Sequence, residues 1–199
     1  DDMIGRNSDR FDGILAGLER LAGADGGEAD RVVFDLEAPA GFQTPPPPPG
    51  RLMVLAEPTI PLALNTDRLV VRTADGALTL MDEARWPDNL PNLLQAKMLQ
   101  AFENAGHGAL VVRPADAFEA DYRLVLDVRA FHLADTDPYE AQGDLTAKLM
   151  DASGKVVATR QFRMTHPAVS RDTGDGVDAL RAVFSAIAVD MVEWSLASM

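Results

Sequence analysis

The histidines and serines are the side chains of this sequence best suited to act as nucleophiles, bases or metal ligands. They are His107, His132, His166, Ser8, Ser153, Ser170, Ser185, Ser195 and Ser198. No histidine is spaced from another so as to share a helix or strand face, as a metal site requires. No serine lies in the strained strand-to-helix turn that exposes a nucleophile. We therefore expect the histidines at surface or helix-capping positions.

The sequence gives little indication of other kinds of reactive centre. The chain has no cysteine, which excludes thiol catalysis, thiolate zinc sites and disulfides. No glycine-rich phosphate loop follows an expected strand, because Gly154, Gly174 and Gly176 lie in turns. Carboxylates are so abundant that their spacing singles out no pair. We expect no catalytic residue, no metal, no cofactor and no enzymatic activity.

Charge narrows the range of partners. The 199 residues include 31 Asp and Glu against 18 Lys and Arg, a net charge of -13. A surface of this sign repels phosphate backbones, so nucleic acid is not an expected partner. With 47% hydrophobic residues the chain can still bury a core. It opens on Asp1 and Asp2, from which we expect a fragment or a processed form.

Seven short runs with strand character follow residue 50. Apolar or alternating residues separated by turn residues are typical of strands. These runs are residues 52–56, 68–72, 77–81, 109–112, 122–132, 144–150 and 156–164. The turns at 73–76 and 151–154 predict hairpins.

Two amphipathic helices are expected among these strands. Pro91 marks the first turn of one, which Gly106 ends, and the other starts near Val177. The order of elements predicts an α+β fold, a mixed β-sheet with two main helices packed on it. A three-layer α/β/α arrangement is the alternative.

The first fifty residues have a different character. Apolar residues at 11, 14, 15, 18 and 21 predict an amphipathic helix over residues 7–22. Residues 31–36 form a strand candidate, and residues 45–49 are five consecutive prolines. Such a run adopts polyproline II and acts as a stiff spacer of roughly 15 Å. Docking of a proline-reading module is the less favoured alternative.

The candidate partner or lipid contacts are Glu57, Trp86 and Pro91. Trp86 precedes a sharply defined helix start, so it can staple the loop onto the first helical turn, or else contact a partner. Glu57 follows the first strand of the domain and is open to the same two interpretations. We expect structural roles for Trp86 and Pro91.

Several of these segments, in this order, resemble the ABC-type transport auxiliary lipoprotein family of Gram-negative envelopes. The first is Val-Leu-Ala-Glu-Pro-Thr at 54–59. Residues 63–72 follow, and then residues 84–95, which include Arg-Trp-Pro-Asp-Asn-Leu-Pro. Residues 120–131 and 156–162 match later strands of the family, and the resemblance spans residues 33–194.

The resemblance implies a function in transport. Such domains are periplasmic accessories of systems in which an ATPase and a permease work with an MCE-domain (mammalian cell entry) protein to move phospholipids between the two membranes. It therefore implies these three proteins as partners, and phospholipid as a candidate ligand. An architectural adaptor or oligomerisation module that binds no lipid is the alternative, and a homo-oligomer stays open.

The chain departs from the family where a lipidated cysteine normally precedes the first strand. The helix expected at 7–22 instead resembles the C-terminal helix of an MCE protein. We therefore expect residues 1–30 to be the tail of a preceding MCE-type region, 31–50 a strand and Pro-rich linker, and 51–199 the auxiliary domain. Fusion implies tethering at the inner membrane; otherwise the family's outer-membrane lipoprotein location is expected.

Overall fold

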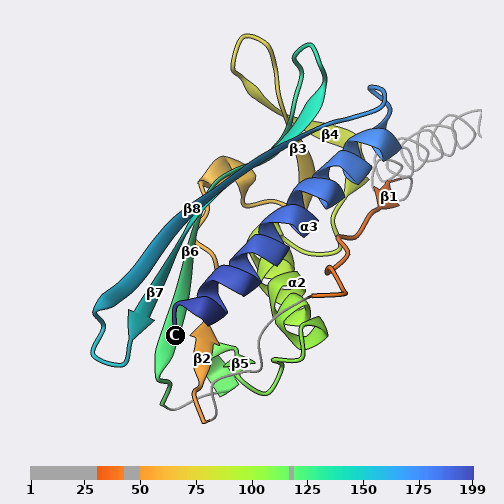
Figure 1. Ribbon diagram of the computed structural model, residues 1–199. Helices are drawn as coiled ribbons and strands as arrows, with labels where there is room; N and C mark the ends of the chain where they lie inside the picture. Colours follow the sequence, from red (N-terminus) through yellow and green to blue (C-terminus); the bar gives the residue numbers. More distant parts are fainter. Residues whose placement is uncertain (1–30, 43–49, 117–118) are drawn as a thin grey trace, which may run out of the picture. The chain divides into compact units, whose positions relative to one another are not determined.

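The computed structural model describes residues 31–42, 50–116 and 119–199 (Figure 1). The chain divides into two compact units, Asp1–Val32 and Val33–Met199. The helix expected at 7–22 and the five prolines at 45–49 lie outside the described residues.

Eight strands form one mixed sheet. They are β1 (Val32–Val33), β2 (Met53–Leu55), β3 (Arg68–Arg72), β4 (Leu78–Arg85), β5 (Val111–Val112), β6 (Tyr122–Ala134), β7 (Glu140–Asp151) and β8 (Val156–Pro167). Two short 3₁₀ helices, η1 (Leu62–Leu64) and η2 (Pro114–Asp116), lie in the connections.

The long strand β6 is the axis of the sheet. Along one edge it pairs antiparallel with β7, which in turn pairs antiparallel with β8. Along its other edge it pairs in parallel first with β2 and then, at its C-terminal end, with β3. Strand order on that side is β1-β4-β3-β6-β2-β5. Both parallel and antiparallel pairs are present, as the predicted mixed sheet requires.

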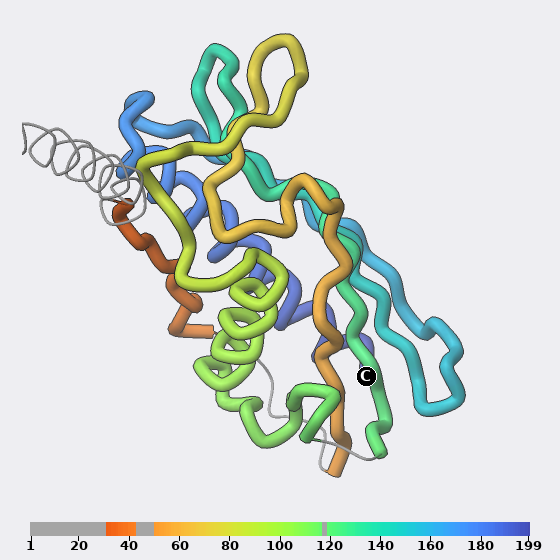
Figure 2. Tube along the Cα trace, turned by 180° about the vertical axis from the view of Figure 1, so that it is seen from behind, coloured from red at the N-terminus to blue at the C-terminus, as the bar shows by residue number. Residues whose placement is uncertain are grey.

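Two helices cover one face of this sheet (Figures 1 and 2). Helix α2 (Leu90–Asn104) starts after Asn89, with Pro91 in its first turn. Helix α3 (Thr173–Ala197) packs on β6, β7 and β8. Side chains of both helices and of β6 and β7 surround the same small apolar cavity, so both helices lie on the same side of the sheet.

Helix α3 approaches the sheet very closely at Gly143 of β7. A Cβ atom at this position would lie 2.6 Å from Cγ1 of Val183 and 2.8 Å from Cδ1 of Ile187. Glycine at 143 therefore permits van der Waals contact between helix and strand backbone that any larger residue would block. Val183 and Ile187 are themselves almost fully buried.

An extended segment after β1 crosses the helical layer. Its anchor is Leu36, which has no exposed surface. Asp35 accepts a hydrogen bond from Nζ of Lys97 on α2 at 2.6 Å, and its carbonyl accepts one from Nε of Arg181 on α3 at 2.9 Å. Asn104 donates to the carbonyl of Pro39 at 2.9 Å. The segment thus ties the two helices together.

The α+β prediction is confirmed, and the described residues form two layers rather than the three of the alternative. Five predicted strands and both helices recur within a few residues of their expected bounds, while β4 and β7 run longer. The expected surface or helix-capping position was wrong for His132, whereas His107 is buried but follows α2, where its backbone N–H donates to the carbonyl of Phe102 at 2.8 Å. His107 and His132 are only 2% and 4% exposed, because His107 packs just after α2 and His132 lies in a strand paired on both edges.

Candidate functional site: the open polar face of the sheet

Up to the bulge after Val128, the side chains of β6 alternate between the two faces of the sheet. Leu124, Leu126 and Val128 point to the helices and are at most 2% exposed. Arg123, Asp127 and Arg129 alternate with them and are exposed on the opposite face. Successive strand residues point to opposite faces, so this alternation leaves one face apolar and covered and the other polar and open.

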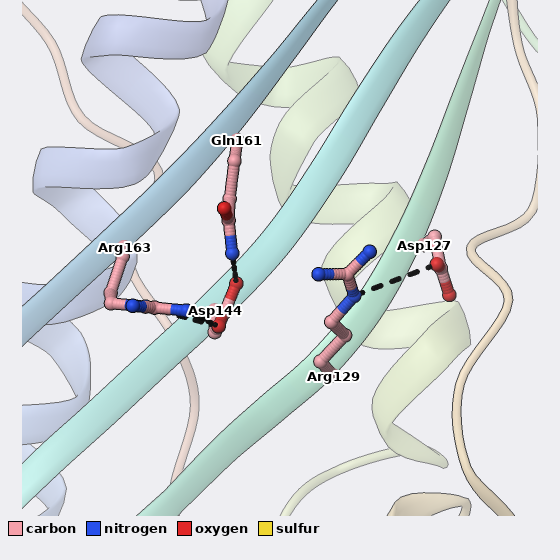
Figure 3. Close-up of polar contacts among 5 residues, drawn as sticks. All are labelled: Asp127, Arg129, Asp144, Gln161 and Arg163. Atoms are coloured by element: carbon pink, nitrogen blue, oxygen red, sulfur yellow. Dashed lines mark hydrogen bonds and ion pairs between the residues drawn. The ribbon is translucent and has the colours of Figure 1, made fainter.

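Asp144 of β7 is the best-connected side chain of the open face (Figure 3). It lies directly opposite Arg163 of β8 in the strand register. Its carboxylate accepts hydrogen bonds from Nη2 of Arg163 at 2.8 Å and from Nε2 of Gln161 at 2.7 Å. Two donors from one neighbouring strand therefore hold the carboxylate in place.

The electrostatics keep Asp144 ionised. Partial burial acts to raise the pKa of Asp144, but it is outweighed by the hydrogen bonds from Gln161 and Arg163 and by the charges of Arg163 and Arg129. The pKa of Asp144 is therefore lowered from its ordinary value. At neutral pH the face carries a fixed carboxylate between guanidinium groups.

Arg129 and Asp127 extend this pattern onto β6. Nε of Arg129 lies 3.9 Å from a carboxylate oxygen of Asp127, and both side chains are more than half exposed. The β6–β7 ladder has a bulge between Val128 and Ala130, which places Arg129 at an irregular position. Bulges re-aim a side chain, and Figure 3 shows the guanidinium of Arg129 between the two carboxylates.

The arrangement fits recognition better than catalysis. Asp144 is already ionised and fully engaged, so it is poorly suited to take up a proton. Alternating charges on an exposed sheet instead offer paired donors and acceptors to a protein surface. We define Asp127, Arg129, Asp144, Gln161 and Arg163 as the open polar face. Within the described ranges, no group of three or more His, Asp or Glu side chains could hold a metal ion.

The structure separates the three residues expected from the sequence. Trp86 is 3% exposed, and its backbone N–H donates to the carbonyl of Asp67 at 2.6 Å. Pro91 is buried in the first turn of α2. Both lie where they stabilise the start of this helix. Glu57 is exposed and follows β2.

Glu57 borders the open polar face. The N–H of Ala56 donates to the carbonyl of Leu124, and that of Thr59 to the carbonyl of Leu126. Thr59 also forms a parallel bridge with Asp127. Glu57 therefore lies in a short irregular stretch along the edge of β6.

The residues of the open polar face were not singled out from the sequence. Their strands were predicted, and the alternation along 122–132 was noted. The prediction lacked the register of β7 and β8, which places Asp144 opposite Arg163. The hairpin turn predicted at 151–154 was a usable signal, because a turn fixes the register of its strands.

Two hollows lie against strands β6 and β7. The apolar cavity under the helices, lined by residues such as Phe131 and Phe184, has a volume of about 10 Å³. An open hollow of about 830 Å³ lies between the start of β6 and the β7–β8 turn. Two of its lining carboxylates bond the backbone, since Asp121 accepts from the N–H of Leu52 and Asp151 from that of Ser153. No helix in the described part of the chain is both long and apolar enough to cross a membrane.

Known proteins share this fold. The chain is 26% identical to a Xanthomonas campestris protein of the family DUF330, whose crystal structure superposes with a TM-score of 0.76 over 84% of this chain and 95% of that one. A second crystal structure, of an uncharacterized protein, gives a TM-score of 0.65 at 15% identity, over 83% of this chain and 98% of that one. The second likeness concerns the fold alone.

Sequence relatives assign the family. An uncharacterized protein of Bradyrhizobium diazoefficiens is 30% identical over 195 residues, which are 98% of this chain and 53% of that protein. The chain thus spans about half the length of this relative. The sequence profile of the ABC-type transport auxiliary lipoprotein component matches residues 34–192, the whole sheet from β2 onward and nearly all of α3. The chain belongs to this family of ABC-transport auxiliary components.

Proposed function

We propose that the chain is a periplasmic, membrane-associated accessory domain of an MCE-type ABC transporter that moves phospholipids between the inner and outer membranes. The observation that carries this proposal is the family match over residues 34–192, which describes an auxiliary component of ABC transport. The domain acts by binding other proteins and catalyses no reaction.

The open polar face is the surface through which it binds. The helices cover the other face, so the exposed side chains of β6, β7 and β8 are free to meet a partner. Glu57 adds a further carboxylate at the border of this surface. The partner is the MCE-domain protein or the permease that works with the ATPase of the same system.

The tether is a covalent fusion to an MCE-type region that ends in the helix expected at 7–22. The greater length of the Bradyrhizobium relative, of which the match covers 53%, supports this part of the proposal. Fusion would raise the effective concentration of the two modules without any new contact. An MCE domain encoded before Asp1 would support fusion, and a lipidation-site cysteine there would refute it.

An architectural adaptor or oligomerisation module without lipid is the second candidate. The small size of the apolar cavity favours it, because about 10 Å³ holds at most one water molecule. Native mass spectrometry of the purified protein separates the two candidates. Co-purified phospholipid favours lipid handling, and a lipid-free species favours the adaptor.

The binding proposal is tested by pull-down with the intact parent protein as bait. Asp144→Ala with Arg163→Ala removes the centre of the open polar face. The matched control is Asp135→Ala with Arg171→Ala, an exposed ion pair away from this face. We expect the first variant to lose the MCE-system partners and the control to retain them. Equal recovery by both variants, or recovery of neither permease nor ATPase by the wild type, would contradict the proposal.

A further inference from the structure

The β3–β4 hairpin joins the rest of the sheet through a short ladder. Strand β3 pairs with β6 at Val71–Leu133 and Arg72–Ala134. One further backbone hydrogen bond runs from the N–H of Asp135 to the carbonyl of Arg72, at 2.8 Å. On its other edge β6 pairs with β7 over twelve residue pairs. The ladder that joins the hairpin to β6 is therefore far shorter than the ladder that joins β7 to β6.

His132 lies at this junction. It precedes Leu133 on β6, so the parallel register places it beside Val70 of β3, and it pairs with Gln142 of β7. Its side chain is buried, and neither ring nitrogen has a hydrogen-bond partner among the described residues. A neutral imidazole carries one donor and one acceptor, and leaving both unpaired in the interior costs free energy.

The charged groups around His132 offer no compensation for a second proton. On β3 the nearest charge is Arg72, a cation. On β7, Glu140 accepts from Gln142 at 2.8 Å, and Asp144 is engaged by Gln161 and Arg163 of β8. On β4, Leu80 lies opposite Val70.

The carboxylate of β4 on that side is also engaged. Asp82 accepts a hydrogen bond from Nη1 of Arg68 at 2.9 Å. An imidazolium at 132 would therefore be a buried cation close to Arg72, with the neighbouring carboxylates already partnered.

We propose that His132 is an acid-sensitive latch. While its ring is neutral it closes the junction between the β3–β4 hairpin and β6, and its protonation releases the hairpin. Release exposes Leu69 and Val70, which are 1% and 3% exposed in the closed junction. It would add them to Leu78 and Leu80 of β4, which are already 45% and 47% exposed.

The direction of the pH effect follows from the protonation states. Burial, and secondly the charge of Arg72, lower the pKa of His132 from its ordinary value of 6.5. The open junction takes up a proton near pH 6.5 and the closed junction only at lower pH. The neutral ring therefore stabilises the closed junction fully above pH 6.5. This stabilisation decreases as pH falls from there toward the folded-state pKa of His132.

Hydrogen exchange at pH 7.5 and 5.5, corrected for intrinsic exchange rates, tests the latch in the 199-residue chain. We expect protection of β3–β4 peptides to fall by up to about tenfold at pH 5.5, with β7–β8 peptides changing less. His132→Phe should remove this loss. The control His166→Gln, which replaces an exposed histidine, should keep it.

An NMR titration of the wild type gives an independent readout that does not depend on a folded variant. The ring protons of His132 should titrate below the ordinary imidazole value of 6.5. The latch is refuted if His132 titrates at or above pH 6.5, if protection of β3–β4 is independent of pH, or if the loss persists in His132→Phe.

Discussion

The two faces of the β6–β8 meander are built from the same strands but have opposite properties. The covered face consists of tightly interlocked apolar side chains, including Leu126 and Phe162, under helix α3. The open face carries ion pairs and hydrogen bonds around Asp144. Burial of apolar surface contributes far more to folding than exposed ion pairs do. Stability should therefore reside on the covered side and recognition on the open side.

The largest effect is expected for Trp86→Ala, between β4 and α2, in the apolar core to which the covered face belongs. The indole is almost fully buried in the core, so truncation should lower the free energy of unfolding by about 3–5 kcal/mol. Urea denaturation measures this. Glu57→Ala is the exposed control and should change stability by less than about 0.5 kcal/mol. Near-wild-type stability of Trp86→Ala would contradict the expectation that buried apolar side chains dominate the free energy of unfolding.

The next effect is expected for Gly143→Val, which places a side chain between β7 and α3. Overpacking should cost about 3 kcal/mol, because the added atoms would meet Val183 and Ile187 at less than 3 Å. The control is Gly174→Ala in the first turn of α3, where an added Cβ meets nothing within 4 Å. We expect this control to be neutral or slightly stabilising in thermal melts.

Asp144→Ala on the open face should have a smaller effect. The loss should be about 1 kcal/mol, because Arg163 is 69% exposed and regains water when its partner is removed. The pKa of Asp144 is lowered in the folded state. The contribution of its carboxylate to stability is therefore present above the ordinary pKa of 3.8 and disappears as pH falls through the folded-state pKa. Wild type and Asp144→Ala should therefore converge in stability at acid pH. A loss above 3 kcal/mol at neutral pH would mean that the open face also stabilises the fold.

The smallest effect is expected for the pair Asp127 and Arg129. Both groups are exposed and 3.9 Å apart, so a double-mutant cycle with alanine should give a coupling energy below about 0.5 kcal/mol. Partner binding should fall by more than stability does. A coupling energy above 1 kcal/mol would mean that this exposed pair also stabilises the fold. Unchanged partner binding would mean that the pair takes no part in recognition.

Much of the fold could be predicted because its signals are local. Pro91 after Asn89 marks the helix start, and Gly154 in the β7–β8 turn has a φ of 84°, which glycine adopts without strain. Strand β4 extends beyond its prediction, to Arg85. Its second half, Asp-Glu-Ala-Arg, is polar and lacks the alternation on which strand prediction depends.

The candidate site was less accessible to prediction than the fold. Asp144, Gln161 and Arg163 are unremarkable polar residues within predicted strands, and only the β7–β8 register brings them together. His132 was predicted at a surface or helix-capping position because no other histidine shares its spacing along a strand or helix face. Its burial depends on β3, which lies sixty residues earlier in the chain.

The sequence by itself determined the elements, the family and the absence of cysteine chemistry, since turn residues, apolar periodicity and composition act over short distances along the chain. Tertiary structure decided which face of the meander the helices cover, which charges meet on the other face, and that His132 is enclosed. These outcomes depend on pairing between distant segments. A shift of one residue in such a pairing would move every side chain of the strand to the opposite face.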